Sequence, residues 1–286
     1  MRKNNIKFLF ALLTILVVFN SCKKEYESIE DIDEAKIQAY IKQNNIPAVK
    51  DPSGYYYQVL DQGTGGEMLN KDSVFYNLSV KSLTGASYYA PLAFSNEGNY
   101  LGYIKPDTYR NALYAINRGG KVRVIIPSYL AYGKNGSSVI PPNEVLVTEI
   151  TVSPETKQWV IDDKIINQFI TDKGLTMAKQ PSRVYTNVAN AGSETVITNR
   201  STIKVKYAGR LLTGTVFDQT TGDETREFSL AGSIIDGWKK GLVGLAKGAK
   251  LRMLIPSDLA YKPAGNAAVP PSSVLDFDIE IVDVTN

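Results

Sequence analysis

Aromatic side chains gather in one stretch of the chain, residues 207–277, and are the first candidates for a functional site. The members singled out are Tyr207, Phe217, Trp238, Tyr261 and Phe277, together with the acid Asp218. Aromatic rings bury large apolar areas, and few ionisable groups stand beside these ones. The pattern indicates an apolar, aromatic-lined cup, which suits the binding of an apolar group better than proton transfer.

The composition excludes several kinds of catalysis. The 286 residues include no histidine and one cysteine, Cys22. Without histidine there is no Ser-His-Asp or Cys-His catalysis and no histidine-ligated metal site. A single cysteine forms no internal disulfide and none of the usual zinc frameworks.

The formal charge of +3 comes from the start of the chain. Arg2, Lys3 and Lys7 lie in the first 21 residues, which contain no acid. The remainder holds 29 basic and 29 acidic residues. A neutral chain without a basic cluster argues against nucleic acid as a partner.

Hydrophobic periodicity predicts the elements that must position the cup. Residues 235–245 carry Trp238 and two leucines at i, i+4 and i+7, which predicts a short helix. Residues 250–255 and 275–281 alternate apolar and polar side chains, which predicts two strands. The proline-rich loop between them holds Tyr261. The helix therefore presents an indole, and the strands and loop bring further aromatic rings toward it.

A shift of 129 residues aligns the chain with itself almost without gaps. Matching motifs are Leu83-Thr84-Gly85 with Leu212-Thr213-Gly214, Leu130-Ala131-Tyr132 with Leu259-Ala260-Tyr261, and Pro141-Pro142 with Pro270-Pro271. Units of this length are domains rather than solenoid repeats. We expect domains at 31–153 and 154–286, both of the α+β class, each with an antiparallel sheet and a preceding helix.

The first residues have the pattern of an export signal. Residues 1–21 begin with basic side chains and continue with an apolar run too short for a comfortable membrane span. Cys22 resembles the lipidated cysteine of a bacterial lipobox, so residues 22–30 would be a tether. This predicts a lipid-anchored protein of the bacterial cell envelope, at the periplasmic face of the outer membrane or at the cell surface. The alternative is a plain secretory signal with an incidental cysteine.

Ordered motifs in the second unit resemble a known family. They are Val205-Lys206-Tyr207-Ala208-Gly209, Gly214-Thr215-Val216-Phe217-Asp218, Ile235-Asp236-Gly237-Trp238, Leu259-Ala260-Tyr261 and Pro270-Pro271. Over residues 200–284 the sequence resembles the FK506-binding-protein (FKBP) type of peptidyl-prolyl cis-trans isomerase. The resemblance implies a twisted antiparallel sheet wrapped over one short helix. It also implies a shallow apolar pocket for the proline of a polypeptide, with no cofactor or metal.

The resemblance implies a role for each residue. Trp238 would form the pocket floor, Asp218 would lie at its rim, and Tyr261 would hydrogen-bond a ligand carbonyl. The implied catalytic residues are Tyr207, Asp218, Trp238 and Tyr261, and the implied substrate-binding residues are Phe217, Ile235, Val269 and Phe277. Arg226 stands where the family usually has a pocket aromatic. Each residue alone could belong to the core, but their joint order favours a site.

Prolyl isomerisation suits a site without nucleophiles. Amide rotation breaks no bond, and its barrier of roughly 18–20 kcal/mol is the loss of conjugation across C–N. A pocket that excludes water and holds the ring while the carbonyl turns binds the twisted form preferentially. The missing histidine is therefore no obstacle.

The first unit keeps the core pattern but not the cup residues. At the shared offset, Leu78, Tyr88, Tyr89, Pro106, Tyr109 and Thr148 replace Tyr207, Phe217, Asp218, Ile235, Trp238 and Phe277. Tyr132 and Ile140 match Tyr261 and Val269, and residues 90–102 show no clear counterpart. We expect a degenerate, catalytically silent domain, so that the cup exists only once.

Three functions remain open. The first is an exported, lipid-anchored prolyl isomerase whose activity resides in residues 200–284 and assists protein folding. The second is a non-catalytic chaperone that holds extended chains, and the third is a structural subunit of an envelope assembly. The retained Tyr207, Asp218, Trp238 and Tyr261 favour the first.

Overall fold

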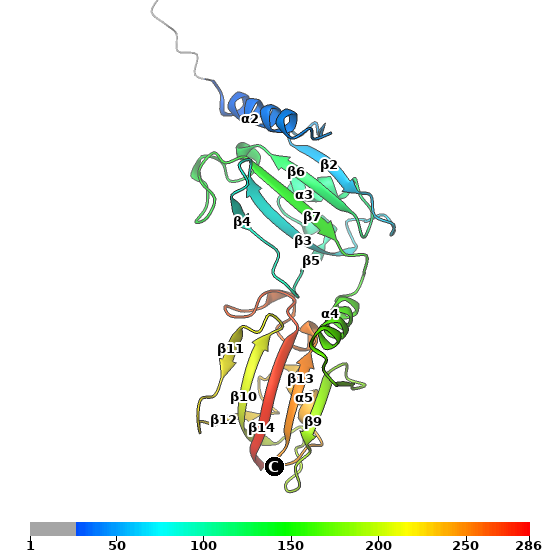
Figure 1. The fold of residues 1–286 in the computed structure, drawn as a ribbon, viewed down its shortest axis with the longest axis vertical. Coiled ribbons are helices and arrows are strands. Elements are labelled where there is room, and N and C mark those ends of the chain that lie inside the picture. Colours follow the sequence, from blue (N-terminus) through cyan, green and yellow to red (C-terminus); the bar gives the residue numbers. More distant parts are fainter. Residues whose placement is uncertain (1–26) are drawn as a thin grey trace, which may run out of the picture.

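The structure, a computed structural model, describes residues 27–286 and contains two seven-stranded antiparallel sheets. The sheets follow one another along the longest axis of the molecule, and each has a longer helix at its start (Figure 1). A shorter helix packs against each sheet. The predicted α+β class with two tandem domains is thus confirmed.

The first domain orders its sheet as β1-β2-β6-β7-β3-β4, and β5 also pairs with β3. Its helices and strands are α2 (Ile29–Gln43), β1 (Val49–Lys50), β2 (Tyr56–Asp61), β3 (Ser73–Ser82), β4 (Ser87–Tyr89), β5 (Glu97–Tyr100), α3 (Asp107–Leu113), β6 (Lys121–Ile126) and β7 (Leu146–Val152). Short 3-10 helices are η1 (Leu101–Tyr103), η2 (Ser128–Leu130) and η3 (Gly133–Asn135).

The second domain repeats this order as β8-β9-β13-β14-β10-β11, and β12 also pairs with β10. Its helices and strands are α4 (Gln158–Lys173), β8 (Ala178–Lys179), β9 (Tyr185–Asn190), β10 (Thr202–Leu211), β11 (Val216–Gln219), β12 (Arg226–Ser229), α5 (Asp236–Leu242), β13 (Lys250–Ile255) and β14 (Leu275–Thr285). The 3-10 helices are η4 (Ser257–Leu259) and η5 (Lys262–Ala264).

The two sheets share one strand register at the offset of 129 residues. Leu78 pairs with Ile150 in the first sheet, and Tyr207 pairs with Ile279 in the second. Even the segment without a recognisable counterpart keeps the offset, because Tyr76 opposes Glu97 as Val205 opposes Arg226. Side chains at equivalent positions can therefore be compared directly.

A buried carboxylate fixes each long helix to its sheet. Asp162 on α4 accepts hydrogen bonds at Oδ2 from the backbone N and the Oγ of Ser257, both at 2.8 Å. Asp33 on α2 makes the same pair of bonds to Ser128, at 2.7 and 2.6 Å. Both acids are fully buried. Because a buried charge needs partners, these bonds hold the start of η2 and of η4 in place.

The β4–β5 loop of the first domain contacts α4 of the second. The ring of Phe94 meets the ring of Phe169 edge-on, with centroids 6.0 Å apart. Asn96 and Gln158 exchange two amide hydrogen bonds of 2.8 and 2.9 Å. Gln158 also donates to Oδ1 of Asp162 at 2.8 Å. The interdomain contact therefore continues into the carboxylate that anchors η4.

The predicted signal segment 1–21 and Cys22 lie outside the described residues, so the lipid anchor stays a prediction. The helix α2 begins at Ile29, inside the predicted tether 22–30. Within residues 27–286, none of the helices combines the length and the apolar composition that crossing a membrane requires.

Candidate active site

Trp238 is the centre of an aromatic cluster in the second domain. Its indole is 3% exposed and extends from α5 toward the sheet. The ring centroids of Tyr207, Phe228 and Phe277 lie 5.4, 5.2 and 5.4 Å from it. All three pairs are edge-on, the geometry that aromatic quadrupoles favour. The predicted floor residue thus lies where strands β10, β12 and β14 converge.

Two glycines let α5 pack closely on β13 and so set the position of Trp238. A β-carbon at Gly237 would lie 2.2 Å from Cγ2 of Ile255. One at Gly241 would lie 2.4 Å from the sulfur of Met253. These distances are too short for a real contact, so larger residues would displace the helix. The first domain has Thr108 and Ala112 at these positions.

A cavity of about 160 Å³ opens over the indole. Its lining residues are Tyr207, Phe217, Asp218, Phe228, Ser233, Ile234, Ile235, Trp238, Tyr261 and Phe277. The structure therefore brings together all the predicted site residues of the second domain except one. Val269 does not line the cavity, because its side chain is 1% exposed and packs within the core.

Phe228 is the main lining residue that the sequence interpretation missed. It lies on β12, two residues after Arg226, and its ring contacts both Tyr207 and Trp238. The sequence does carry a signal for Phe228: polar and apolar residues alternate in the short strand β12, which leads to the buried Leu230. Phe228 thus brings an aromatic ring to the lining from the strand that carries Arg226.

A polar network closes the rim of the cavity. The Tyr207 hydroxyl donates to Oδ2 of Asp218 at 2.6 Å. Nη1 of Arg226 donates to Oδ1 of Asp218 at 2.7 Å and to the Tyr207 oxygen at 2.8 Å. Burial raises the pKa of the Tyr207 phenol well above its usual range, and the hydrogen bond to the Asp218 carboxylate raises it further. Tyr207 is therefore a neutral donor, and the Asp218 charge is paired with a cation.

Tyr261 follows η4 and forms the opposite wall. Its ring meets Phe217 edge-on, with centroids 6.4 Å apart. Burial, and then the charge of Asp218, raises the pKa of the Tyr261 phenol. The hydroxyl therefore keeps its proton at neutral pH and can donate a hydrogen bond. Ser257, at the start of η4, is held by Asp162, so α4 contributes to the placement of this wall.

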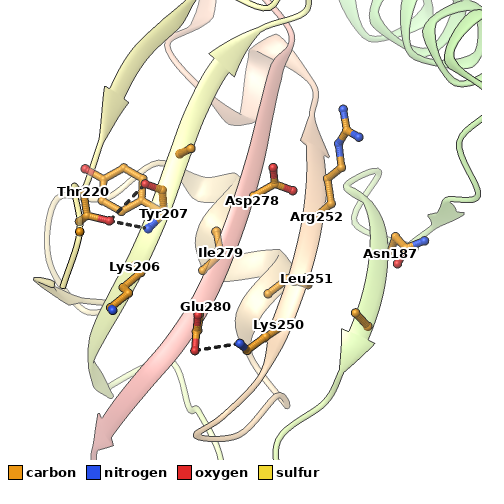
Figure 2. Close-up of a pocket in the computed structure, with 13 residues that line it drawn as sticks. Asn187, Lys206, Tyr207, Thr220, Lys250, Leu251, Arg252, Asp278, Ile279 and Glu280 are labelled. Carbon is orange, nitrogen blue, oxygen red and sulfur yellow. Dashed lines mark hydrogen bonds and ion pairs between the residues drawn. The ribbon is translucent and has the colours of Figure 1, made fainter. Parts of the chain in front are cut away.

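A larger hollow of about 500 Å³ lies on the opposite face of the same sheet. Figure 2 shows Lys206, Lys250, Arg252, Asp278 and Glu280 around it, on strands β10, β13 and β14. The ammonium of Lys250 pairs with Glu280 at 3.1 Å. Successive strand residues face opposite ways, so this charged face turns away from Trp238. Tyr207 is the one aromatic residue among those that line it, so it does not have the cluster of rings that surrounds the indole.

The first domain also contains a cavity between its short helix and its sheet, so the prediction that the cup exists only once is wrong. This cavity has a volume of about 610 Å³. Tyr109 on α3 stands in place of Trp238, and Leu78 and Tyr132 stand in place of Tyr207 and Tyr261. The substituted residues changed the lining of the cavity without closing it.

Among residues 27–286 no group of three or more metal-ligating side chains comes together. The rim network and the aromatic walls can bind and orient a polypeptide segment. They offer no unpaired general base and no nucleophile with a lowered pKa, so the arrangement suits catalysis without covalent steps.

Comparison with known proteins finds one family in both domains. A family model described as "FKBP-type peptidyl-prolyl cis-trans isomerase" matches residues 106–153 and 193–282. The isomerase FkpA of Escherichia coli K12 is 38% identical over 118 residues, which are 41% of this chain and 43% of FkpA. A probable FKBP-type isomerase of Haemophilus influenzae is 36% identical over 114 residues, 39% of this chain and 47% of that protein. The chain thus spans less than half the length of these relatives.

Among solved structures, a peptidyl-prolyl isomerase of Pseudomonas syringae is 28% identical, with a TM-score of 0.39. The similarity covers 44% of this chain and 94% of that one. The family match includes Tyr207, Asp218, Trp238 and Tyr261, which meet at one cavity in the structure. The two matched segments, residues 106–153 and 193–282, therefore belong to the FKBP-type peptidyl-prolyl cis-trans isomerase family.

Proposed function

We propose that this protein is a peptidyl-prolyl cis-trans isomerase that assists protein folding, and that catalysis takes place at the cavity over Trp238. The observation that carries the proposal is the aromatic cavity of about 160 Å³ with its rim of Tyr207, Asp218 and Arg226. Its substrates are Xaa-Pro bonds of proline-containing polypeptides. Uncatalysed exchange takes tens to hundreds of seconds, which is slow compared with most folding steps.

The cavity offers the twisted amide a better environment than water does. A prolyl ring above Trp238 is surrounded by Phe217, Phe228 and Phe277, so the substrate loses water on binding. The carbonyl preceding the ring must turn, and the neutral Tyr261 phenol is placed to donate a hydrogen bond to it. Interactions that are stronger for the twisted form than for the planar one lower the barrier. No proton transfer or bond cleavage is involved.

The direct test is isomerisation of a short Xaa-Pro peptide by the full chain, followed by NMR exchange or by isomer-specific proteolysis. We expect acceleration in proportion to protein concentration. A folded protein that binds the peptide without accelerating its isomerisation would favour the non-catalytic chaperone. A folded protein that neither binds the peptide nor accelerates its isomerisation would favour the third function, a structural subunit of an envelope assembly.

We also propose that Cys22 carries the lipid that anchors the protein to the cell envelope. The support is the basic and apolar pattern of residues 1–21 directly before the single cysteine of the chain. Cys22→Ser should move the protein from the membrane fraction to the soluble fraction and abolish labelling by a radioactive fatty acid. Ser21→Ala keeps a small residue before the cysteine, so it should leave both unchanged. Membrane retention of the Cys22→Ser protein would contradict the anchor.

A further inference from the structure

We propose that the cavity of the first domain is a second peptide-binding site, which takes a bulky apolar side chain next to a lysine or arginine and does not catalyse isomerisation. The site is separate from the proposed catalytic cavity and does not depend on its activity. The argument rests on the volume, the lining, the charge and the edge of this cavity.

The cavity is large and tyrosine-rich. Its volume of about 610 Å³ compares with about 160 Å³ over Trp238. Five phenol rings line it, from Tyr76, Tyr88, Tyr89, Tyr109 and Tyr132. Cavities of roughly 300–1,000 Å³ with mainly aromatic and apolar walls and few polar groups are those that bury ligands in proteins. The space exceeds what one prolyl ring fills.

Smaller side chains account for the extra volume. Leu78 replaces Tyr207, and Thr148 replaces Phe277. The Tyr109 hydroxyl reaches Oγ1 of Thr148 at 3.0 Å, across space that an aromatic ring occupies in the second domain. Thr108 also stands where Gly237 allows α5 to approach Ile255, so α3 cannot approach the equivalent Ile126 as closely. The cavity therefore accepts a leucyl or aromatic side chain.

Glu97 gives the lining a negative group where the second domain has Arg226. The Tyr89 hydroxyl donates to Oε1 of Glu97 at 2.9 Å, and no cation of residues 27–286 lies within 4 Å of this carboxylate. Lys105 lines the same cavity but is paired with Asp107 at 2.7 Å. An unpaired carboxylate beside an apolar cavity favours a ligand that brings a lysine or arginine.

The shape of the entrance suits an extended polypeptide. The strand β4 pairs with β3 on one side only, so within the described part of the chain its outer edge is free. Free strand edges bind extended peptides through main-chain hydrogen bonds, and adjacent pockets take the side chains. Tyr132 and Val139 border the cavity and are 50% and 63% exposed, which gives the peptide an apolar rim to contact.

The site has no counterpart of the rim network over Trp238. Tyr89 stands in place of Asp218, and its partner is an acid instead of a guanidinium. Burial, followed by the Glu97 charge, raises the pKa of Tyr76 to about 12, so this phenol stays neutral beside the carboxylate. The first domain therefore holds a chain without promoting rotation about its Xaa-Pro bonds.

The test uses the full chain carrying Cys22→Ser and two fluorescein-labelled, proline-free hexapeptides, Ala-Lys-Phe-Leu-Lys-Ala and Ala-Glu-Phe-Leu-Glu-Ala. Fluorescence anisotropy should show tighter binding of the basic peptide. Glu97→Lys should weaken the basic peptide about tenfold and strengthen the acidic one, since a charge-assisted contact contributes about that factor. Tyr132→Ala should weaken both peptides. Circular dichroism checks that each variant is folded.

Two controls locate the binding. Tyr103→Ala removes a tyrosine of the same domain that is 72% exposed and does not line the cavity, so binding should not change. Asp218→Ala alters the other cavity and should also leave binding of these peptides unchanged. The proposal is wrong if the basic peptide does not bind, or if Glu97→Lys and Tyr132→Ala have no effect. Loss of binding in Asp218→Ala would assign the peptide to the second domain instead.

Discussion

Replacing Asp218 with alanine should lower kcat/KM for an Xaa-Pro peptide about tenfold while leaving the protein folded. The carboxylate accepts hydrogen bonds from both the Tyr207 hydroxyl and Arg226. Without it, both groups lose their shared acceptor at the rim where the carbonyl turns and keep only their direct contact of 2.8 Å. The loss of one such contact corresponds to about 1.4 kcal/mol. The Asp218 side chain is 42% exposed, so its removal opens no hole in the core.

The Asp218→Asn variant separates geometry from charge. Asparagine keeps an oxygen that can accept from Tyr207 but removes the nearer charged partner of Arg226, whose remaining acid is Glu224 at 3.7 Å. We expect an activity between those of the wild type and Asp218→Ala, with the loss mainly in kcat. This split is expected because the network lies beside the turning carbonyl, whereas the aromatic walls bind the ring in both states.

Asp223→Ala is the matched control for charge. Its carboxylate is fully exposed and pairs with Lys206 at 2.9 Å, on the charged face of the sheet. Removing it changes the net charge as Asp218→Ala does, so activity should stay at the wild-type level. Equal losses in both variants would point to long-range electrostatics. An unchanged kcat/KM in Asp218→Ala would show that the site residues are wrongly assigned.

The fold could be predicted because the determining patterns are local or repeated. The alternation of apolar and polar residues in 250–255 and 275–281 predicts two strands, which the structure shows as β13 and β14. The offset of 129 residues, set by short motifs, holds through every strand pair of the two sheets that we compared. Hydrophobic periodicity and the internal duplication can be read from the sequence alone, without knowing which segments lie close together in space.

Which residues line each cavity depends on distances between segments that are far apart in the sequence. The hydrophobic periodicity of the sequence does not reveal these distances. Val269 and Phe228 are both apolar residues near the predicted cup, and only packing shows that the first is core and the second is lining. A residue-by-residue comparison of the two domains does not reveal the first-domain cavity. A change such as Trp238 to Tyr109 removes an indole, but whether the space closes depends on how near the helix lies to the sheet.

The amide pair between domains is likewise invisible in the sequence. Asn96 and Gln158 are 62 positions apart and belong to no motif. Their contact links the loop beside Glu97 to Asp162, and Asp162 in turn holds Ser257 ahead of Tyr261. The first-domain site therefore adjoins the interface, and the second-domain site is reached from it through two hydrogen-bonded steps, Gln158 to Asp162 and Asp162 to Ser257. Asp162 is accordingly the residue whose loss we expect to have the widest effect.

Asp162→Ala should lower the free energy of unfolding of the second domain by about 3 kcal/mol or more. The substitution leaves the backbone N–H and hydroxyl of Ser257 and one amide hydrogen of Gln158 without partners in a buried place. Both tryptophans of the chain, Trp159 and Trp238, lie in this domain, so denaturation followed by tryptophan fluorescence reports on it separately. Asp162→Asn keeps an oxygen for Ser257 and should be much milder.

Comparing the wild type with Asp162→Asn also predicts the direction in which stability changes with pH. Burial raises the pKa of Asp162 from 3.8 to about 6, against the opposing effect of its hydrogen bonds. The folded protein therefore keeps this proton at pH values where the unfolded chain has lost it. The resulting stabilisation is complete below about pH 4 and is lost as the pH rises through about 6. Relative to Asp162→Asn, the wild type should lose about 3 kcal/mol between pH 4 and 7.

The first domain supplies the control for this experiment. Asp33 holds Ser128 as Asp162 holds Ser257, but Ile29 stands where the second domain has Gln158, and Oδ1 of Asp33 has no hydrogen-bond partner. Asp33→Asn should leave the tryptophan-monitored transition unchanged at every pH, because it alters the other domain. If Asp33→Asn shifts that transition as strongly as Asp162→Asn does, the two domains unfold as one cooperative unit. If the wild type and Asp162→Asn respond to pH alike, the raised pKa of Asp162 is wrong.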